Sequence, residues 1–131
     1  MSLQRRWYEE VWNQGNEAAI DELAAPDVIA HGLTDADGKE VVGTEAFKTL
    51  FRAFRSALTD LHVDVQDSIQ QGDMSAARCV VTASHTGEGL GIVAKGNRVT
   101  FTGMTMCREK DGRLVESWNH FDFATMYQQM Q

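Results

Sequence analysis

The spacing of apolar residues changes near residue 60, and this change limits the folds that the chain can adopt. Over residues 44–58 apolar side chains recur every three or four positions, which predicts an amphipathic helix. Beyond residue 61 they alternate with polar ones, as in strands with one buried face. Helices followed by consecutive strands, joined by turns such as Asp111-Gly112, predict an α+β fold in which a bent antiparallel sheet wraps over helices.

The predicted elements fill most of the chain. The expected helices cover residues 3–13, 17–25, 44–58 and 123–130. The expected strands cover residues 61–70, 74–86, 97–109 and 113–121, after a short extended segment at 27–32. No linker, repeat or low-complexity segment divides these elements. We therefore expect one domain, residues 1–131, which buries about two-thirds of the surface that its unfolded chain exposes.

The composition disfavours partners with dense negative charge. The chain has 12 Lys and Arg against 19 Asp and Glu, a formal net charge of -7, whereas nucleic-acid binding relies on clustered basic residues. No segment approaches the roughly 18 uninterrupted apolar residues of a membrane span, and the N-terminus lacks the apolar run of a signal peptide. We therefore expect a cytoplasmic protein that binds neither nucleic acid nor membrane.

The histidines and cysteines do not predict a metal site. No two of the four histidines stand at i, i+4 spacing, and the two cysteines are not separated by two residues, so the ligand spacing of a zinc site is missing. The segment "GEGLG" leads into a further predicted strand rather than a helix. This context favours a glycine-rich hairpin over a phosphate-binding loop.

Strand alternation predicts which side chains face the helices. Asn119, Thr105 and His85 belong to the small and apolar sets, so we expect them to point inward, while Glu116 and His120 point outward. The outward sets also contain five apolar residues: Val80, Met104, Met106, Leu114 and Trp118. This patch is larger than a monomer usually exposes, so we expect a homodimer that packs outer sheet face against outer sheet face.

With these features the chain resembles the SnoaL-like polyketide cyclases and predicted ester cyclases of the nuclear transport factor 2-like group. The resemblance is carried, in order, by "VWNQGNEAAIDELAAPDVIAHG", "GTEAFKTLFRAF", "GDMSAARCVVTASHTGEGLG", the "V.FTG" near 99 to 103 and "DGRLVESWNHFDFATMYQQM". It implies a conical, cystatin-like barrel in which N-terminal helices pack in the bent sheet around an apolar pocket. It also implies a small apolar ligand, with no cofactor and no metal.

The resemblance further implies a mechanism and a position for its base. In such cyclases an acidic residue on the last strand removes a proton next to a carbonyl, and the enolate closes a ring in an aldol reaction. Counted from the hairpin glycine, Asn119 stands at that position, and Thr105 stands where a histidine of the preceding strand is expected. An amide offers only hydrogen bonds, so a base would have to come from elsewhere in this chain.

Three residues are candidates for that base. Asp122 is the nearest carboxylate, although an aspartate directly before the helix at 123–130 typically caps that helix. His31 shares its strand parity with Ile29, and His85 points inward by alternation. A neutral imidazole accepts protons near pH 7. We expect His31 or Asp122 to act as the base, and His85 to contact the substrate.

The other predicted site residues hold the substrate. Asn119 and Thr105 can stabilise a developing oxyanion by hydrogen bonds, and Trp12 and Phe121 are expected in the pocket wall. Three functions are open at this point. The first is a SnoaL-like enzyme that cyclises or isomerises a small apolar carbonyl compound, and the second is a non-catalytic ligand-binding protein that has lost the base. An epoxide hydrolase is a weaker third, because it needs an inward Asp and Arg pair that no strand position supplies.

Overall fold

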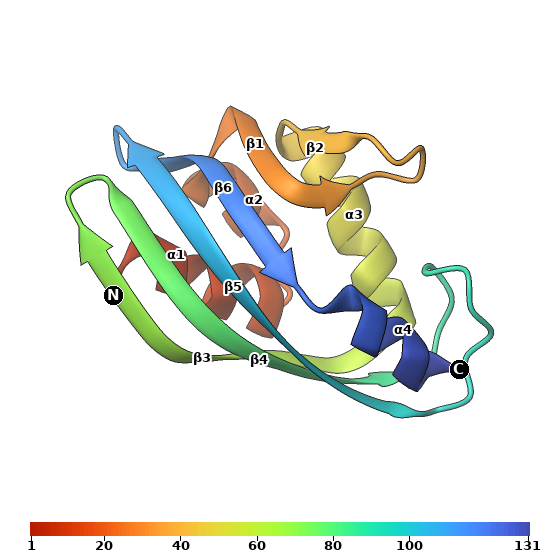
Figure 1. Cartoon of the computed structure of the whole chain (residues 1–131). Helices are drawn as coiled ribbons and strands as arrows, with labels where there is room; N and C mark the ends of the chain where they lie inside the picture. The colour runs from red at the N-terminus through yellow and green to blue at the C-terminus, as the bar shows by residue number, and fades with distance from the viewer.

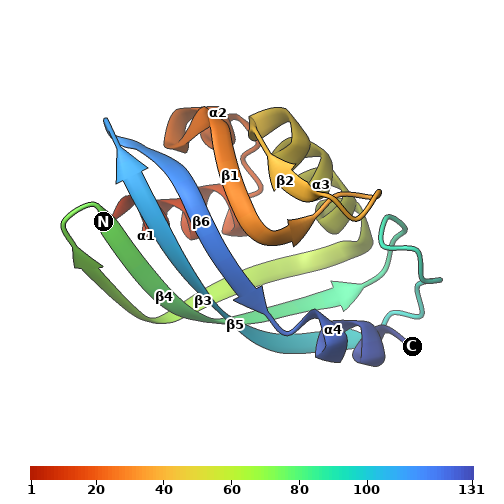
Figure 2. The ribbon, with the colours of Figure 1, turned by 45° about the horizontal axis from the view of Figure 1, so that its top comes forward.

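The alternating second half of the chain forms most of a six-stranded sheet in the computed structural model, which describes residues 1–131 (Figure 1). The strands are β1 (Ala24–Thr34), β2 (Glu40–Val42), β3 (Leu58–Gln71), β4 (Met74–His85), β5 (Arg98–Lys110) and β6 (Arg113–Phe121). Their order is β2-β1-β6-β5-β4-β3, and all neighbours run antiparallel except β1 and β6. The α+β class is confirmed. The sheet curls strongly without closing into a barrel (Figure 2).

The helices occupy the inner side and one end of this sheet. They are α1 (Leu3–Arg6), the π-helix η1 (Trp7–Asn13), α2 (Ala18–Leu23), α3 (Thr44–Ala57) and α4 (Phe123–Met130). Figure 1 shows the N-terminal helices and α3 inside the curl, and α4 directly after β6. Phe47 and Phe51 of α3 are buried, as its amphipathic pattern predicts. None of these helices is long and apolar enough to cross a bilayer.

The N-terminal helix changes from an α-helix to a π-helix at Trp7, and this change brings two tryptophans to the same side of the helix. In η1 the backbone N–H of Gln14 donates to the carbonyl of Glu9, five residues earlier, at 2.9 Å. In an α-helix two residues five positions apart would lie about 140° apart around the axis. In the wider π turn they come closer together, and the Trp7 and Trp12 rings lie 4.9 and 5.9 Å from the ring of Phe47.

The start of the sheet differs from the sequence prediction. The second helix ends at Leu23 rather than at residue 25, and β1 begins at Ala24. Pro26 lies within β1, where the pairing with β6 shifts register between Ala24 and Ile29. Because proline has no N–H to donate to a ladder, it is tolerated at such an irregularity. β2 was not predicted, because a strand of three residues is too short to show alternation.

Leu114 faces inward, contrary to the prediction. The pairing of β5 with β6 shifts register between Arg108 and Glu109, and a bulge of this kind moves the following side chains to the other face. Leu114 is therefore buried and contacts the pocket. The outer-face patch keeps its other four members: Val80, Met104, Met106 and Trp118.

Candidate functional site

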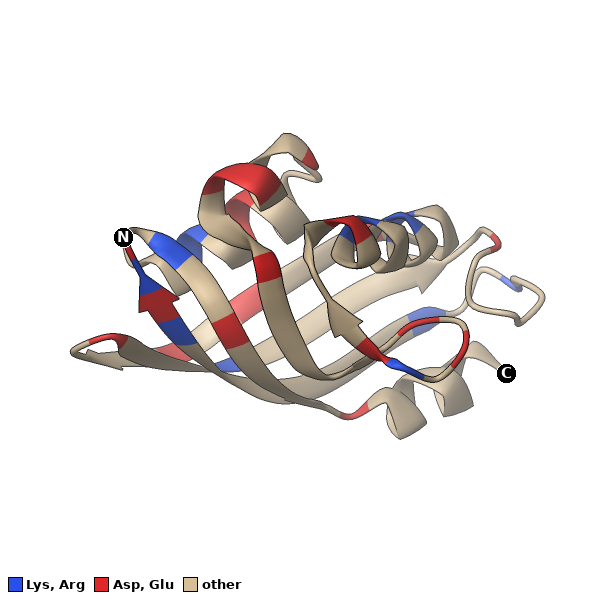
Figure 3. Cartoon of the chain, turned by 90° about the horizontal axis from the view of Figure 1, so that it is seen from above, with Lys and Arg blue, Asp and Glu red and all other residues tan.

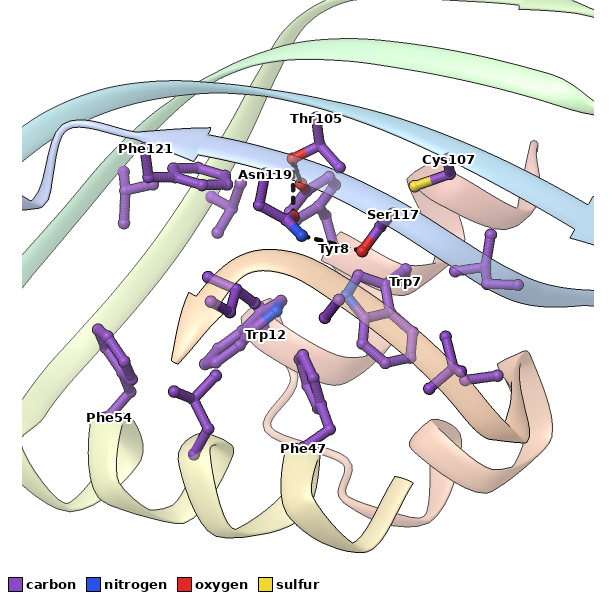
Figure 4. Close-up of a pocket in the computed structure, with 18 of the residues that line it drawn as sticks. Trp7, Tyr8, Trp12, Phe47, Phe54, Thr105, Cys107, Ser117, Asn119 and Phe121 are labelled. Carbon is purple, nitrogen blue, oxygen red and sulfur yellow. Dashed lines mark hydrogen bonds between the residues drawn. The ribbon is translucent and has the colours of Figure 1, made fainter. Parts of the chain in front are cut away.

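An apolar pocket lies between the helices and the inner face of the sheet (Figure 4). Of its 21 lining residues 18 are hydrophobic, so the pocket suits a ligand that is mostly hydrocarbon. The cavity measures about 90 Å³, less than the ~150 Å³ of an apolar cavity that binds benzene. Part of the pocket wall is formed by aromatic side chains that are only partly buried, namely Trp12, Phe54 and Phe121. A ligand with one ring therefore requires such aromatic side chains to move.

Four polar side chains form a hydrogen-bonded chain at one side of the pocket. The Thr105 hydroxyl donates to Oδ1 of Asn119 at 3.2 Å. Because this uses the only proton of Thr105, the Tyr8 hydroxyl must be the donor in its 2.7 Å contact with Thr105. The amide nitrogen of Asn119 donates to the Ser117 hydroxyl at 2.9 Å and to the backbone carbonyl of His31 at 3.0 Å. The chain therefore has a defined direction, from Tyr8 to Ser117.

This direction leaves hydrogen-bond donors for a ligand. The Ser117 oxygen accepts from Asn119, and its own proton has no acceptor within the chain. Trp7 and Trp12 also line the pocket, and their indole N–H groups have no hydrogen-bond partner in the chain. Figure 4 shows both indoles below Ser117. All functional groups of Asn119, by contrast, are already paired. The pocket thus presents three free donors, and it matches a ligand with a carbonyl oxygen.

The pocket lining contains no group that can act as a base near neutral pH. No Asp, Glu or His contributes to it. Burial raises the pKa of Tyr8 well above its ordinary value, and burial raises the pKa of the Cys107 thiol to about 12. Both side chains therefore stay protonated. The pocket can orient a substrate and donate hydrogen bonds, but it offers no proton acceptor of its own.

His31 lies on the outer face of the sheet and not in the pocket, contrary to the expected placement. Val28 and Ala30 of β1 face the pocket, which leaves Ile29 and His31 on the opposite side. The His31 ring lies between two carboxylates, with Nδ1 2.9 Å from Glu40 and Nε2 2.6 Å from Glu116. These bonds, that with Glu116 first, raise the pKa of His31.

Asp122 and His85 are also outside the pocket. Asp122 is exposed and caps α4, because its carboxylate accepts from the backbone N–H and the hydroxyl of Thr125 at 3.1 and 2.6 Å. These bonds, that from the hydroxyl first, lower the pKa of Asp122, which disfavours a role as base. His85 faces inward and is fully buried, with neither ring nitrogen paired. It stands four residues beyond the pocket residue Val81, roughly 13 Å along β4.

The structure brings the remaining predicted residues together. Thr105, Asn119, Trp12 and Phe121 all line the pocket, and the inward positions predicted by alternation for Thr105 and Asn119 are confirmed. Their contact with a substrate stays a prediction. Sequence reasoning missed the role of Ser117, although it shares the inward parity of Asn119 two residues away. The polar role of Tyr8 could not be found, because it depends on the packing of η1 against β5.

Charged side chains gather neither in the pocket nor into a metal centre. No three His, Cys, Asp or Glu side chains meet in a geometry that could hold a metal ion. Figure 3 shows acidic residues on both helices and strands, with basic residues interspersed among them. Cys79 and Cys107 are free, buried thiols. The polar chemistry of the pocket therefore rests on uncharged hydroxyl, amide and indole groups.

Residues 2–130 match the sequence profile of a family described as SnoaL-like polyketide cyclase. The chain belongs to the SnoaL-like polyketide cyclase family. IdmH from Streptomyces antibioticus, a candidate polyketide cyclase, is 32% identical with a TM-score of 0.82, over 97% of this chain and 94% of IdmH. AclR from Streptomyces galilaeus, a candidate hydroxylase, is 25% identical with a TM-score of 0.81, over 98% of this chain and 81% of AclR. No curated protein matches this sequence.

A third solved structure supports the fold alone. A candidate SnoaL-like polyketide cyclase from Jannaschia sp. CCS1 superposes with a TM-score of 0.85, over 98% of this chain and 88% of that one, at 19% sequence identity. The nuclear transport factor 2-like architecture that the sequence resemblance implied is thus confirmed.

Proposed function

We propose that the pocket binds a small, mostly apolar carbonyl compound and promotes its cyclisation or isomerisation. The observation that carries this proposal is the pairing of apolar walls with free donors from Ser117, Trp7 and Trp12. A carbonyl oxygen suits the donors, and a hydrocarbon remainder suits the walls. Membership in the SnoaL-like family and the likeness to IdmH support a general role as a small-molecule cyclase.

The mechanism proposed for this pocket differs from that of a cyclase in which a carboxylate acts as the base. Aldol ring closure breaks a C–H bond next to one carbonyl, and the enolate carbon then forms a C–C bond with a second carbonyl. Because no lining side chain accepts the proton, we assign its removal to water. The donors stabilise the enolate oxygen, and the walls hold the reacting carbons together. The hydronium ion formed in the first step returns its proton to the new alkoxide, so the protons balance.

A non-catalytic role in ligand binding is the second candidate. The observation that favours it is the absence of Asp, Glu and His from the pocket lining. Acetonylacetone separates the two functions, because its aldol closure gives a methylcyclopentenone and water, and the enone can be followed by its ultraviolet absorbance. Saturable acceleration that Ser117→Ala reduces would support the cyclase. Saturable binding of acetonylacetone without acceleration would favour the binding protein.

We also propose that the protein forms a homodimer through the outer-face patch. Met104 and Met106 are 55% and 48% exposed. Met106 pairs across the sheet with Trp118, and Met104 lies two residues away on the same face of β5. Light scattering should give the mass of a dimer for the native protein. It should give the mass of a monomer for the double variant Met104→Glu, Met106→Glu. Ile69→Glu, which adds the same charge at an exposed site on β3, should leave the dimer intact. A monomeric native protein would refute the proposal.

A further inference from the structure

The outer-face cluster around His31 contacts the pocket through the backbone of β1. The imidazole of His31 points away from the pocket, but its carbonyl accepts the hydrogen bond from Nδ2 of Asn119 on the inner side. The backbones of β1 and β6 approach closely at this point. A Cβ at Gly32 would overlap the backbone carbonyl oxygen of Asn119. A shift of β1 at residue 31 therefore acts directly on Asn119.

The geometry of the cluster favours a charged ring, because carboxylates lie beside both ring nitrogens of His31. Glu40 and Glu116 each place a carboxylate oxygen against a different nitrogen of His31. Only an imidazolium donates from both nitrogens, whereas a neutral imidazole has one N–H and would turn a lone pair toward one carboxylate. The ring also stacks on Trp118 at 5.5 Å, and Arg108 lies 3.6 Å from Glu116. In its charged form His31 thus joins β1 to both of its neighbours, β2 and β6.

We infer that the His31 imidazolium, held between Glu40 and Glu116, is a positioning residue for Asn119 and acts through the backbone carbonyl of His31. Asn119 in turn orients the hydroxyls of Thr105 and Ser117. When His31 loses its proton, one of its two ring contacts with a carboxylate is lost. β1 is then held less firmly at this point, and the hydrogen bond from Asn119 to the carbonyl of His31 weakens. The order of the donors in the pocket then depends on pH, although no group that lines the pocket titrates near neutrality.

This inference extends the proposed function, and a measurement without any ligand tests it separately. In heteronuclear spectra of the whole chain, the side-chain NH₂ resonances of Asn119 should move with pH and share the midpoint of the His31 ring resonances. Glu116→Gln removes one carboxylate partner and should move both midpoints to lower pH together. His31→Ala should abolish the movement at Asn119.

His120 provides the matched control. It is the same residue type, neighbours Asn119 on β6 and is exposed on the outer face. His120→Gln should leave the midpoint at Asn119 unchanged. The inference is overturned if the Asn119 resonances stay flat while His31 titrates, if their movement survives His31→Ala, or if they follow His120. A merely structural role for His31 would change stability in the variants without linking the two midpoints in the native chain.

Discussion

Replacing Asn119 by leucine is expected to lower the free energy of unfolding by about 2–6 kcal/mol, because two groups inside the protein lose their partner at ~1–3 kcal/mol each. These groups are the Thr105 hydroxyl and the His31 carbonyl, which are bonded to opposite ends of the amide. Leucine has the same branched shape and the same number of side-chain heavy atoms as asparagine, so the substitution leaves no cavity. Urea unfolding of the two proteins measures the difference.

His120→Leu is the matched control for this substitution. It introduces the same side chain at the next position of β6, where the native residue is exposed. A surface change of this kind usually stays within about 0.5 kcal/mol. If Asn119→Leu were as mild as His120→Leu, the hydrogen-bonded chain from Tyr8 to Ser117 could not be part of the folded protein.

Gly32→Ala is expected to be the most disruptive single substitution at the site, with a loss of more than about 4 kcal/mol or no folded protein at all. Its φ of 84° disfavours any side chain, and a Cβ would overlap the carbonyl oxygen of Asn119. This obstacle is backbone, so it cannot rotate away as a side chain would. Thermal unfolding followed by circular dichroism measures the loss.

Gly38→Ala separates backbone strain from steric overlap. Gly38 has a similar φ of 77°, but a Cβ there meets nothing within 4 Å. It should therefore cost only the strain of the left-handed region, about 1–2 kcal/mol. Equal losses for Gly32→Ala and Gly38→Ala would contradict the close approach of β1 to Asn119.

The sequence predicted the fold better than it predicted the site. Apolar spacing found α3 and all four long strands of the second half, because each buries one regular face. Alternation also placed Asn119 and Thr105 on the inner side. It failed at Leu114, where a register shift reverses the parity, because nothing in the residue types marks such a shift.

His31 shows why the site itself was harder to predict. The alternation of Val28, Ile29, Ala30 and His31 was visible, but parity alone does not say which set is buried. The side was decided by the packing of Val28 and Ala30 around the pocket, and the partners Glu40 and Glu116 come from strands distant in sequence. The sequence also could not show the direction of the hydrogen bonds from Tyr8 to Ser117, since it depends on three-dimensional contacts between η1, β5 and β6.

We propose that the pocket receives a carbonyl oxygen on free donors that Asn119 organises. The most direct test is titration of acetophenone labelled with carbon-13 at its carbonyl, with ethylbenzene as the matched ligand that lacks the oxygen. We predict a saturable downfield movement of the carbonyl resonance, reduced in Ser117→Ala, and about 2–10-fold tighter binding of acetophenone than of ethylbenzene, as one net hydrogen bond gives. Acetophenone bound without movement of its carbonyl resonance, or no more tightly than ethylbenzene, would contradict the claim.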